Sequence, residues 1–345
     1  METTAGEKLT ILRPGCFNTN QGPDFLDARI KIDLNIWAGN IELHVNASDW
    51  KRHLHSTDPN YRNVILHVVW LDDDEYPLHE IPTLVLADRV PKILLQQYDQ
   101  WMNSGSFIPC GQYSFYAEEI VWISWKERLL VERLNRKYRQ IKLMLEQNHY
   151  NWNETLWWLI ARYFGLQVNA EAFEEIARAV PYDILLKNEP DALQLEKLFL
   201  EKVKEIKIPL HFLRMRPAAF PDLRLKQLAE FTCSHKNLFK TIIESDNSRQ
   251  LRSIFPNTII INAVLPLLFA HGRLYTNEEQ VSRAIDILNA LPPEKNNIIN
   301  QFKKLGIGSS NAADSQSLIE LKTQYCDHRR CLECAIGNAI LKRKR

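Results

Sequence analysis

The hydrophobic pattern of this chain changes near Val90, and that change constrains the fold more than any other feature of the sequence. Before it, short apolar runs such as residues 28–32 and 63–70 are separated by Asp, Asn, Gly and Pro, which is typical of β-strands. The second run is almost entirely apolar and predicts a central strand buried on both faces.

After Val90, apolar side chains recur at helical spacing, most clearly over residues 120–147. Further helical patterns cover residues 153–165, 170–179, 191–203, 223–233, 258–270, 277–290 and 295–305. We therefore predict an α+β or α/β protein, with a mixed β-sheet domain over residues 1–115 and an all-α domain over residues 116–345.

The length and composition of the chain limit the classes of protein to which it can belong. A chain of 345 residues can bury two hydrophobic cores, and its formal net charge of +1 creates no global attraction for nucleic acid. No apolar run reaches the roughly 20 residues of a membrane span, and residues 1–6 lack the layout of a signal peptide. Six cysteines in a chain this long do not resemble a disulfide framework. We expect a cytoplasmic protein without a membrane partner; the sequence does not indicate an oligomeric state.

Two acidic residues and a histidine form the main candidate site. Asp24 follows Gly-Pro at a turn, and Glu42 and His44 alternate with apolar residues, so they share one face of a strand. If the chain folds back between Asp33 and Gly39, Asp24 comes close to both. This spacing matches the PD-(D/E)xK nuclease motif, with His in place of the usual Lys. The two carboxylates would bind Mg²⁺ or Mn²⁺, and His44 would orient water. The alternative is a strand face exposed to solvent.

A second polar cluster follows this strand. His53 and His55 could add a metal ligand or a phosphate contact, and Arg52 could bind a substrate phosphate. The alternative is a solvated loop. His67, alone in an apolar strand, is expected to be a core histidine.

Cysteines near the end of the chain form a third candidate site. Cys326, Cys331 and Cys334 form a C-x4-C-x2-C array, and thiolates at this spacing can bind one metal ion or cluster. Zinc and an iron–sulfur cluster both suit thiolates, so the spacing does not separate them. The alternative is three reduced thiols. A fourth ligand would come from elsewhere, with Cys110 as the first choice before Cys16, Cys233 and His328.

Three stretches together resemble the domain-of-unknown-function family 2851, a bacterial family. They are residues 22–25 with 39–45 and 48–50, residues 216–221 with 224–225, and residues 329–338. The resemblance implies a PD-(D/E)xK-type core that carries Asp24, Glu42 and His44. It also implies that Cys110 and the three terminal cysteines match cysteines of the family.

Two functions follow from these observations. The favoured one is a metal-dependent, nuclease-like hydrolase that cleaves nucleic-acid phosphodiesters. The alternative is a non-catalytic nucleic-acid-binding or scaffold protein with a degenerate nuclease core and a structural metal site.

Overall fold

A computed structural model describes residues 1–74, 81–188, 191–206, 208–212, 220–245 and 247–343. Residues 213–219, which include part of the family-like stretch at 216–221, lie outside the described residues. The chain forms two compact units, Met1–Asn103 and Ser104–Arg345. Residues 104–115, assigned to the first domain from the sequence, therefore belong to the second unit.

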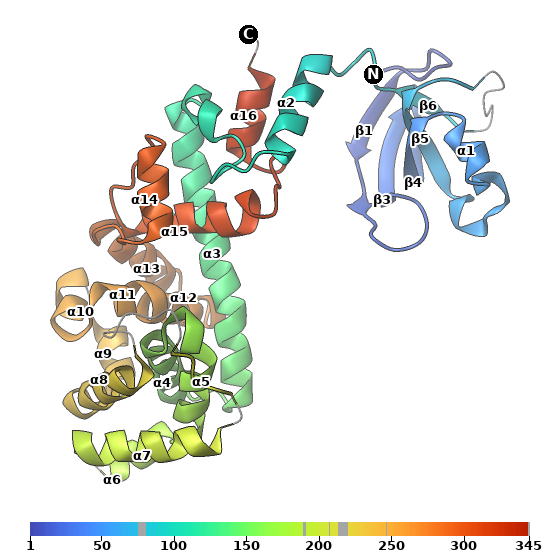
Figure 1. Cartoon of the computed structure of the whole chain (residues 1–345). Coiled ribbons are helices and arrows are strands. Elements are labelled where there is room, and N and C mark those ends of the chain that lie inside the picture. Colours follow the sequence, from blue (N-terminus) through green and yellow to red (C-terminus); the bar gives the residue numbers. More distant parts are fainter. Residues whose placement is uncertain (75–80, 189–190, 207, 213–219, 246, 344–345) are drawn as a thin grey trace. The chain divides into compact units, whose positions relative to one another are not determined.

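The first unit contains a curled mixed sheet (Figure 1). Its strands lie in the order β1-β3-β4-β5-β6, with β2 paired to β3. Pairing is antiparallel from β1 through β3 to β4, and parallel from β4 through β5 to β6. The bounds are β1 (Leu9–Arg13), β2 (Cys16–Phe17), β3 (Phe25–Ile32), β4 (Asn35–Asn46), β5 (Val64–Leu71) and β6 (Thr83–Val85).

The hairpin between β3 and β4 turns more tightly than expected. Its turn lies at Asp33 and Leu34, with Asp33 in the left-handed region at φ 50°. Gly39 is not part of the turn but lies inside β4. A Cβ atom there would approach the carbonyl oxygen of Asn63 to 2.5 Å, so a larger residue would disturb the approach of the chain to β5.

The sheet carries the apolar core of this unit, with buried residues on both faces of β5. Its buried members are Leu9, Ala28, Ile30, Ile32, Ile41, Ile65, Leu66, Val68 and Leu84. The expected burial of β5 is confirmed, because its first six residues are all buried.

The connection between β4 and β5 lies beside the sheet. It contains α1 (Asp49–Arg52), η1 (His55–Thr57) and η2 (Pro59–Tyr61). A parallel strand pair requires such a crossover, since the chain must return to the starting edge. Trp50 from α1 is buried and contacts the rings of His44 and His67 on the sheet. The same unit ends with α2 (Lys92–Met102).

The described part of the second unit is helical, as predicted. The expected helix over 120–147 is confirmed as α3, which α12, α15 and α16 pack against (Figure 1). The bounds are η3 (Gly111–Tyr116), α3 (Glu119–Gln147), α4 (Trp152–Phe164), α5 (Leu166–Ala179), α6 (Tyr182–Asn188), α7 (Ala192–Glu205), α8 (Pro221–Ser234), α9 (Leu238–Glu244), α10 (Ser248–Ile254), α11 (Asn257–Ile259), η5 (Ile260–Val264), α12 (Leu265–Leu274), α13 (Glu278–Ala290), α14 (Asn297–Lys304), α15 (Ala312–Glu320), η6 (Leu321–Cys326) and α16 (Ala335–Lys342).

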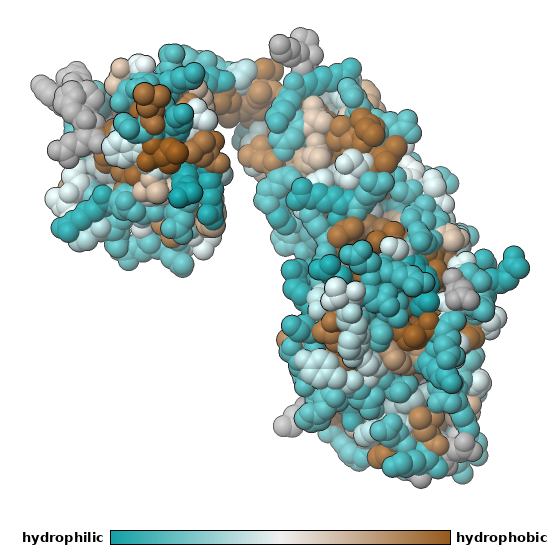
Figure 2. Space-filling model, turned by 180° about the vertical axis from the view of Figure 1, so that it is seen from behind, coloured by the Kyte–Doolittle hydropathy of each residue, from teal (hydrophilic) through white to brown (hydrophobic). Residues whose placement is uncertain are grey.

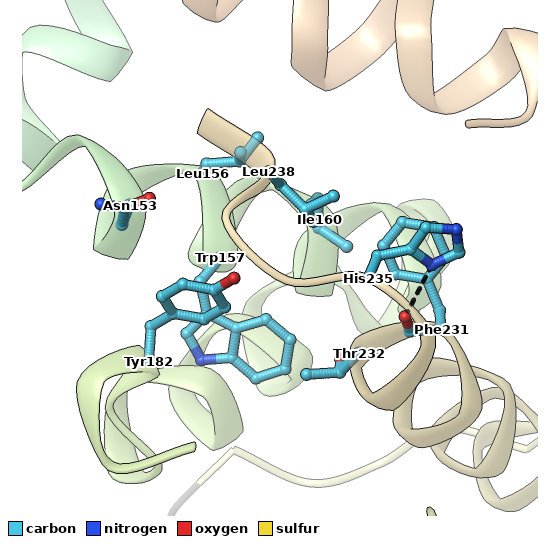
Figure 3. A pocket seen from close by; sticks show the side chains of 9 residues that line it. All are labelled: Asn153, Leu156, Trp157, Ile160, Tyr182, Phe231, Thr232, His235 and Leu238. Carbon is cyan, nitrogen blue, oxygen red and sulfur yellow. Dashed lines mark hydrogen bonds between the residues drawn. The ribbon is translucent and has the colours of Figure 1, made fainter. Parts of the chain in front are cut away.

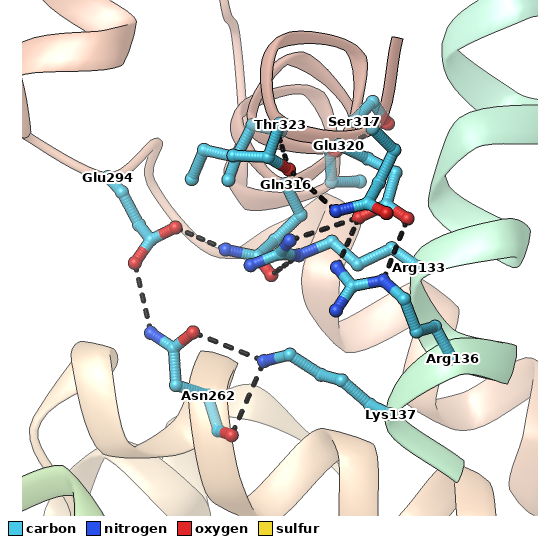
Figure 4. Close-up of polar contacts among 12 residues, drawn as sticks. Arg133, Arg136, Lys137, Asn262, Glu294, Gln316, Ser317, Glu320 and Thr323 are labelled. Carbon is cyan, nitrogen blue, oxygen red and sulfur yellow. Dashed lines mark hydrogen bonds and ion pairs between the residues drawn. The ribbon is translucent and has the colours of Figure 1, made fainter. Parts of the chain in front are cut away.

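A polar network joins α3 to α15 inside this unit. Arg133 and Arg136 point from α3 toward the buried carboxylate of Glu320, with Arg133 Nη1 at 3.2 Å from Oε2 and Arg136 Nε at 3.1 Å from Oε1 (Figure 4). Lys137 donates to Asn262 Oδ1 at 3.2 Å, and Asn262 donates to Glu294 at 3.0 Å. Buried charges of this kind are retained only where they have partners.

The surface is mixed in character. In Figure 2 hydrophobic side chains are interspersed with hydrophilic ones on the visible face of both units. One described helical stretch, Asn257–Leu274, is long and apolar enough to cross a membrane, and 67% of it is buried inside the protein, as in a core helix.

Candidate metal centre

Asp24 and Glu42 lie next to each other, and each carboxylate accepts a hydrogen bond from a backbone amide of the segment that carries the other residue. The amide of Asp24 donates to Glu42 Oε2 at 3.1 Å, and the amide of Leu43 donates to Asp24 Oδ2 at 2.9 Å. These bonds connect the entry into β3 with the middle of β4. One oxygen of each carboxylate, Oδ1 of Asp24 and Oε1 of Glu42, takes no part in them.

The polar face of β4 is the buried one at this position. Glu42 is 6% exposed, whereas Leu43 and Val45 on the opposite face are 41% and 65% exposed. A solvent-exposed face bearing Glu42 is therefore not what the structure contains. Strand alternation placed Glu42 and His44 together, and the crossover that carries Trp50 encloses them.

His53 and His55 converge on this face because of the backbone at Leu54. α1 ends at Arg52, and Leu54 adopts the left-handed conformation at φ 59° before η1 begins. This turn brings both imidazoles beside His44, with ring centroids at 5.1 and 5.2 Å. A non-glycine residue in this region is strained by about 1–2 kcal/mol, which is common at functional sites.

Two of the three imidazoles lie against one oxygen of Glu42, and the third lies against His44. His44 Nε2 and His55 Nε2 each lie 3.5 Å from Glu42 Oε1, and His53 Nδ1 lies 3.2 Å from His44 Nε2. One nitrogen of each of the three rings lies within 4.8 Å of the other two. Such an arrangement presents nitrogen and oxygen donors to a single point.

His67 supports this group from β5. It is buried, as the sequence predicted, and its Nε2 lies 2.8 Å from His44 Nδ1. A hydrogen bond at Nδ1 orients the imidazole and leaves Nε2 of His44 directed at Glu42. His67 is therefore a positioning residue that sequence reasoning assigned only to the core.

Burial and neighbouring charges shift the pKa values of these groups. Burial, with the nearby Asp24, raises the pKa of Glu42 to about 7. Burial, with the adjacent His55 and His53, lowers the pKa of His44 to about 4, and burial first, then His53, lowers that of His55. Neutral imidazoles carry a free lone pair at pH 7, which is the form that binds metal ions.

The donor set fits a divalent transition metal. Nε2 of His55 is buried and has no hydrogen-bond partner among the described residues, although it faces Glu42. A buried polar atom without a partner is costly, and a bound cation would satisfy it. Imidazole donors suit zinc, iron, nickel or copper, whereas Mg²⁺ prefers an oxygen shell. The expected pair of carboxylates for Mg²⁺ or Mn²⁺ is thus joined by three imidazole nitrogens, of which sequence reasoning had considered those of His53 and His55 as possible added ligands.

Two nearby side chains complete the surroundings. Tyr61 stacks on His55 with centroids 3.7 Å apart, and the ring restricts the imidazole on one side. Arg52, considered from the sequence for binding substrate, pairs with Asp49 at 2.6 Å. The spacing His-x8-His-x-His was the sequence signal for the nitrogen cluster, but only the turn at Leu54 makes it converge.

The cysteines predicted as ligands lie in the second unit. Cys110 directly precedes η3, Cys326 ends η6, and Cys334 is the residue before α16. Cys331 lies in the loop between the last two and is buried. The structure brings the four together, as described below.

An apolar pocket in the second unit has fewer side chains that could take part in catalysis or bind a metal ion than the site on β4. Figure 3 shows Trp157, Tyr182 and Phe231 around it, with His235 at one side. His235 Nδ1 lies 3.0 Å from the carbonyl oxygen of Phe231. No carboxylate is among the described residues that line this pocket.

Comparison with known proteins identifies the family. A family model described as "Protein of unknown function (DUF2851)" matches residues 1–206 and 201–258. The match includes every member of the histidine cluster and ends before the terminal cysteines. No curated protein and no solved structure matches the chain, and neither comparison links it to the PD-(D/E)xK nucleases. Because the match covers more than half of the 345 residues, the chain belongs to the DUF2851 family.

Proposed function

We propose that the first unit is a metal-dependent hydrolase that cleaves phosphodiester bonds in nucleic acid. The observation that carries this proposal is the convergence of His44, His53 and His55 on one another, with Glu42 Oε1 at 3.5 Å from two of them and the buried Trp50 against the His44 ring. A bound divalent ion would supply Lewis-acid activation of water and would offset negative charge on the phosphate.

The residues of the chain would perform three tasks. The three imidazoles would hold the ion, and His67 would keep the His44 ring in its orientation. Glu42 would act as general base through Oε1, because Oε2 is already held by the Asp24 amide. A carboxylate with a pKa of about 7 is well matched to proton transfer near neutral pH.

The choice of a phosphodiester rests on the resemblance to the PD-(D/E)xK motif. Asp24 precedes β3, and Glu42 and His44 follow on the antiparallel partner β4, so the two carboxylates meet across one hairpin. β5 then runs parallel to β4. This placement supports an active site of the nuclease type on the polar face of the sheet.

The proposal is tested with single- and double-stranded DNA and RNA in the presence of Zn²⁺, Mn²⁺, Co²⁺, Ni²⁺ or Mg²⁺. We expect cleavage that falls at least 100-fold in Glu42→Gln and in His55→Ala, because each removes a group at the centre of the site. His211→Ala is the matched control, since this exposed histidine lies in the second unit and bonds to the side chain of Asn169 through its backbone amide and carbonyl. Equal cleavage by wild type and both site variants, or no cleavage with any of the ions, would contradict the proposal.

A non-catalytic role is the second candidate, and one observation favours it. Asp24 Oδ2 is committed to the Leu43 amide, and a histidine stands where the motif usually has lysine. In this case the protein would bind metal and nucleic acid without cleaving it. A gel-shift assay in parallel with the cleavage assay distinguishes the two roles.

A further inference from the structure

Four cysteines of the second unit lie near one another, where the first and last segments of this unit are in contact. Cys110 lies before η3, which contacts α16, and the other three flank the loop between η6 and α16. Arg329 from this loop donates to the carbonyl oxygen of Ser104 at 3.1 Å. Segments more than 200 residues apart in the sequence therefore lie side by side.

All four sulfur atoms lie within electrostatic range of one another. Each of the six pairs among Cys110, Cys326, Cys331 and Cys334 is close enough to interact electrostatically. Cys110, Cys331 and Cys334 are buried. No disulfide joins any of these described residues. A group of four thiols that are close but not bonded, three of them buried and one half-buried, is typical of a metal or cluster site.

Hydrogen-bond donors surround the sulfur of Cys334. Trp125 is 4% exposed, and its Nε1 has no partner of ordinary hydrogen-bond geometry among the described residues. The amides of Gly337 and Ile336 and the Trp125 indole donate hydrogen bonds toward the Cys334 sulfur. An indole N–H left without an oxygen acceptor and directed at sulfur points to a negatively charged ligand there.

Positive charge lies near the same sulfurs. Lys322 lies within electrostatic range of Cys326, and Arg329 lies within electrostatic range of Cys331. Lys322 is also paired with Asp327, and its ammonium lies 4.9 Å from the centre of the Phe107 ring. These cations would balance part of the charge of four thiolates and a cluster.

The spacing of the sulfurs favours a cluster over a single ion. A single tetrahedral zinc ion with Zn–S bonds near 2.3 Å holds its sulfurs about 3.8 Å apart. Within the described part of the chain, three donors that all lie within 4.8 Å of one another occur at His44, His53 and His55, and no three of these four sulfurs lie that close together. A four-iron cluster separates its cysteines further, because each binds a different corner of the cluster.

We propose that Cys110, Cys326, Cys331 and Cys334 hold a four-iron iron–sulfur cluster that fastens the segment around Cys110 to the end of the chain. This site is independent of the proposed hydrolase centre, since it lies in the other unit. Its role is structural, and it requires no redox change.

The test is purification of the full chain without oxygen, followed by reconstitution with ferrous iron and sulfide. We expect a brown protein with about four iron atoms and four sulfides per chain. Cys331→Ser and Cys110→Ser should each lose most of the visible absorption, whereas Cys233→Ser, outside the group, should keep it. Colourless protein with one zinc, or no uptake of iron after reconstitution, would overturn the proposal.

A second measurement uses wild-type protein only, so it tests the proposal even if the cysteine variants fail to fold. Wild-type protein is treated with an oxidant and a chelator, and limited proteolysis is followed in parallel with the loss of colour. Cleavage should increase within residues 104–111 and 326–334 as the cluster is lost. Unchanged proteolysis after complete loss of iron would show that the cluster does not fasten these segments.

Discussion

His44 Nδ1 lies 2.8 Å from His67 Nε2, so a buried residue of β5 sets the direction of a ring on β4. Since β4 and β5 are parallel neighbours in register at Glu42 and His67, the two rings are held by the backbone of the sheet itself. The His44 ring is therefore already oriented with Nε2 toward the proposed metal site, and it loses no rotamer freedom when a metal ion binds.

We expect His67→Phe to weaken metal binding by about 10- to 100-fold, because loss of an outer partner releases the orientation of a ligand. His67→Gln keeps a polar group at the position and should recover part of the affinity. The measurement is competition for Zn²⁺ or Co²⁺ against a chromophoric chelator, with circular dichroism as the control for folding. Equal affinity in wild type and His67→Phe would remove the positioning role.

The ion pairs of Glu320 should contribute strongly to stability. Its carboxylate is 3% exposed and binds Arg133 and Arg136, so Glu320→Ala leaves two guanidinium groups without their acceptor. We expect the free energy of unfolding to fall by about 3–5 kcal/mol. Urea denaturation measures it, and Glu146→Gln, in an exposed pair with Lys142, should change it by less than about 0.5 kcal/mol. A loss below about 1 kcal/mol in Glu320→Ala would contradict this account.

Lys137 should make stability depend on pH. Burial, with the nearby Arg133, lowers its pKa from 10.5 to about 7. The unfolded chain then binds more protons than the folded protein between these two values, so the free energy of unfolding rises with pH from about 7 to 10.5. Lys137→Met should flatten that part of the curve, and Lys142→Met, at an exposed position, should not. Urea midpoints measured across this range provide the comparison, and parallel curves for wild type and Lys137→Met would exclude the effect.

Gly337 is required by the close approach of α16 to the cysteine loop. A Cβ atom there would lie 2.3 Å from the carbonyl oxygen of Cys331, which is backbone and cannot rotate away. We expect Gly337→Ala to lower the free energy of unfolding by roughly 1–3 kcal/mol. Gly308→Ala is the control, since nothing lies within 4 Å of a Cβ at that position. Thermal and urea unfolding of both variants measure the difference, and equal stability would mean that the loop shifts without cost.

Sequence patterns predicted helices and strands well where their formation depends on interactions between residues close together in the sequence. The 3.6-residue period over 120–147 depends only on which side chains share a helix face, and α3 begins and ends within one residue of that range. The apolar run at 63–70 likewise became the central strand β5. Turns were less predictable, because the tight turn at Asp33 depends on a left-handed backbone that several residue types adopt.

The sequence by itself determined which parts of the chain form strands and which form helices, the family, and the placement of Glu42 and His44 on one face of a strand. Only the tertiary structure decided that this face is buried and that His53, His55 and His67 join it, because alternation specifies shared faces but not which face is covered. The same holds for Cys110, which meets Cys326, Cys331 and Cys334 only after α16 packs on α3 and η3. Contacts between distant segments follow from the packing of whole elements, and no local spacing encodes them.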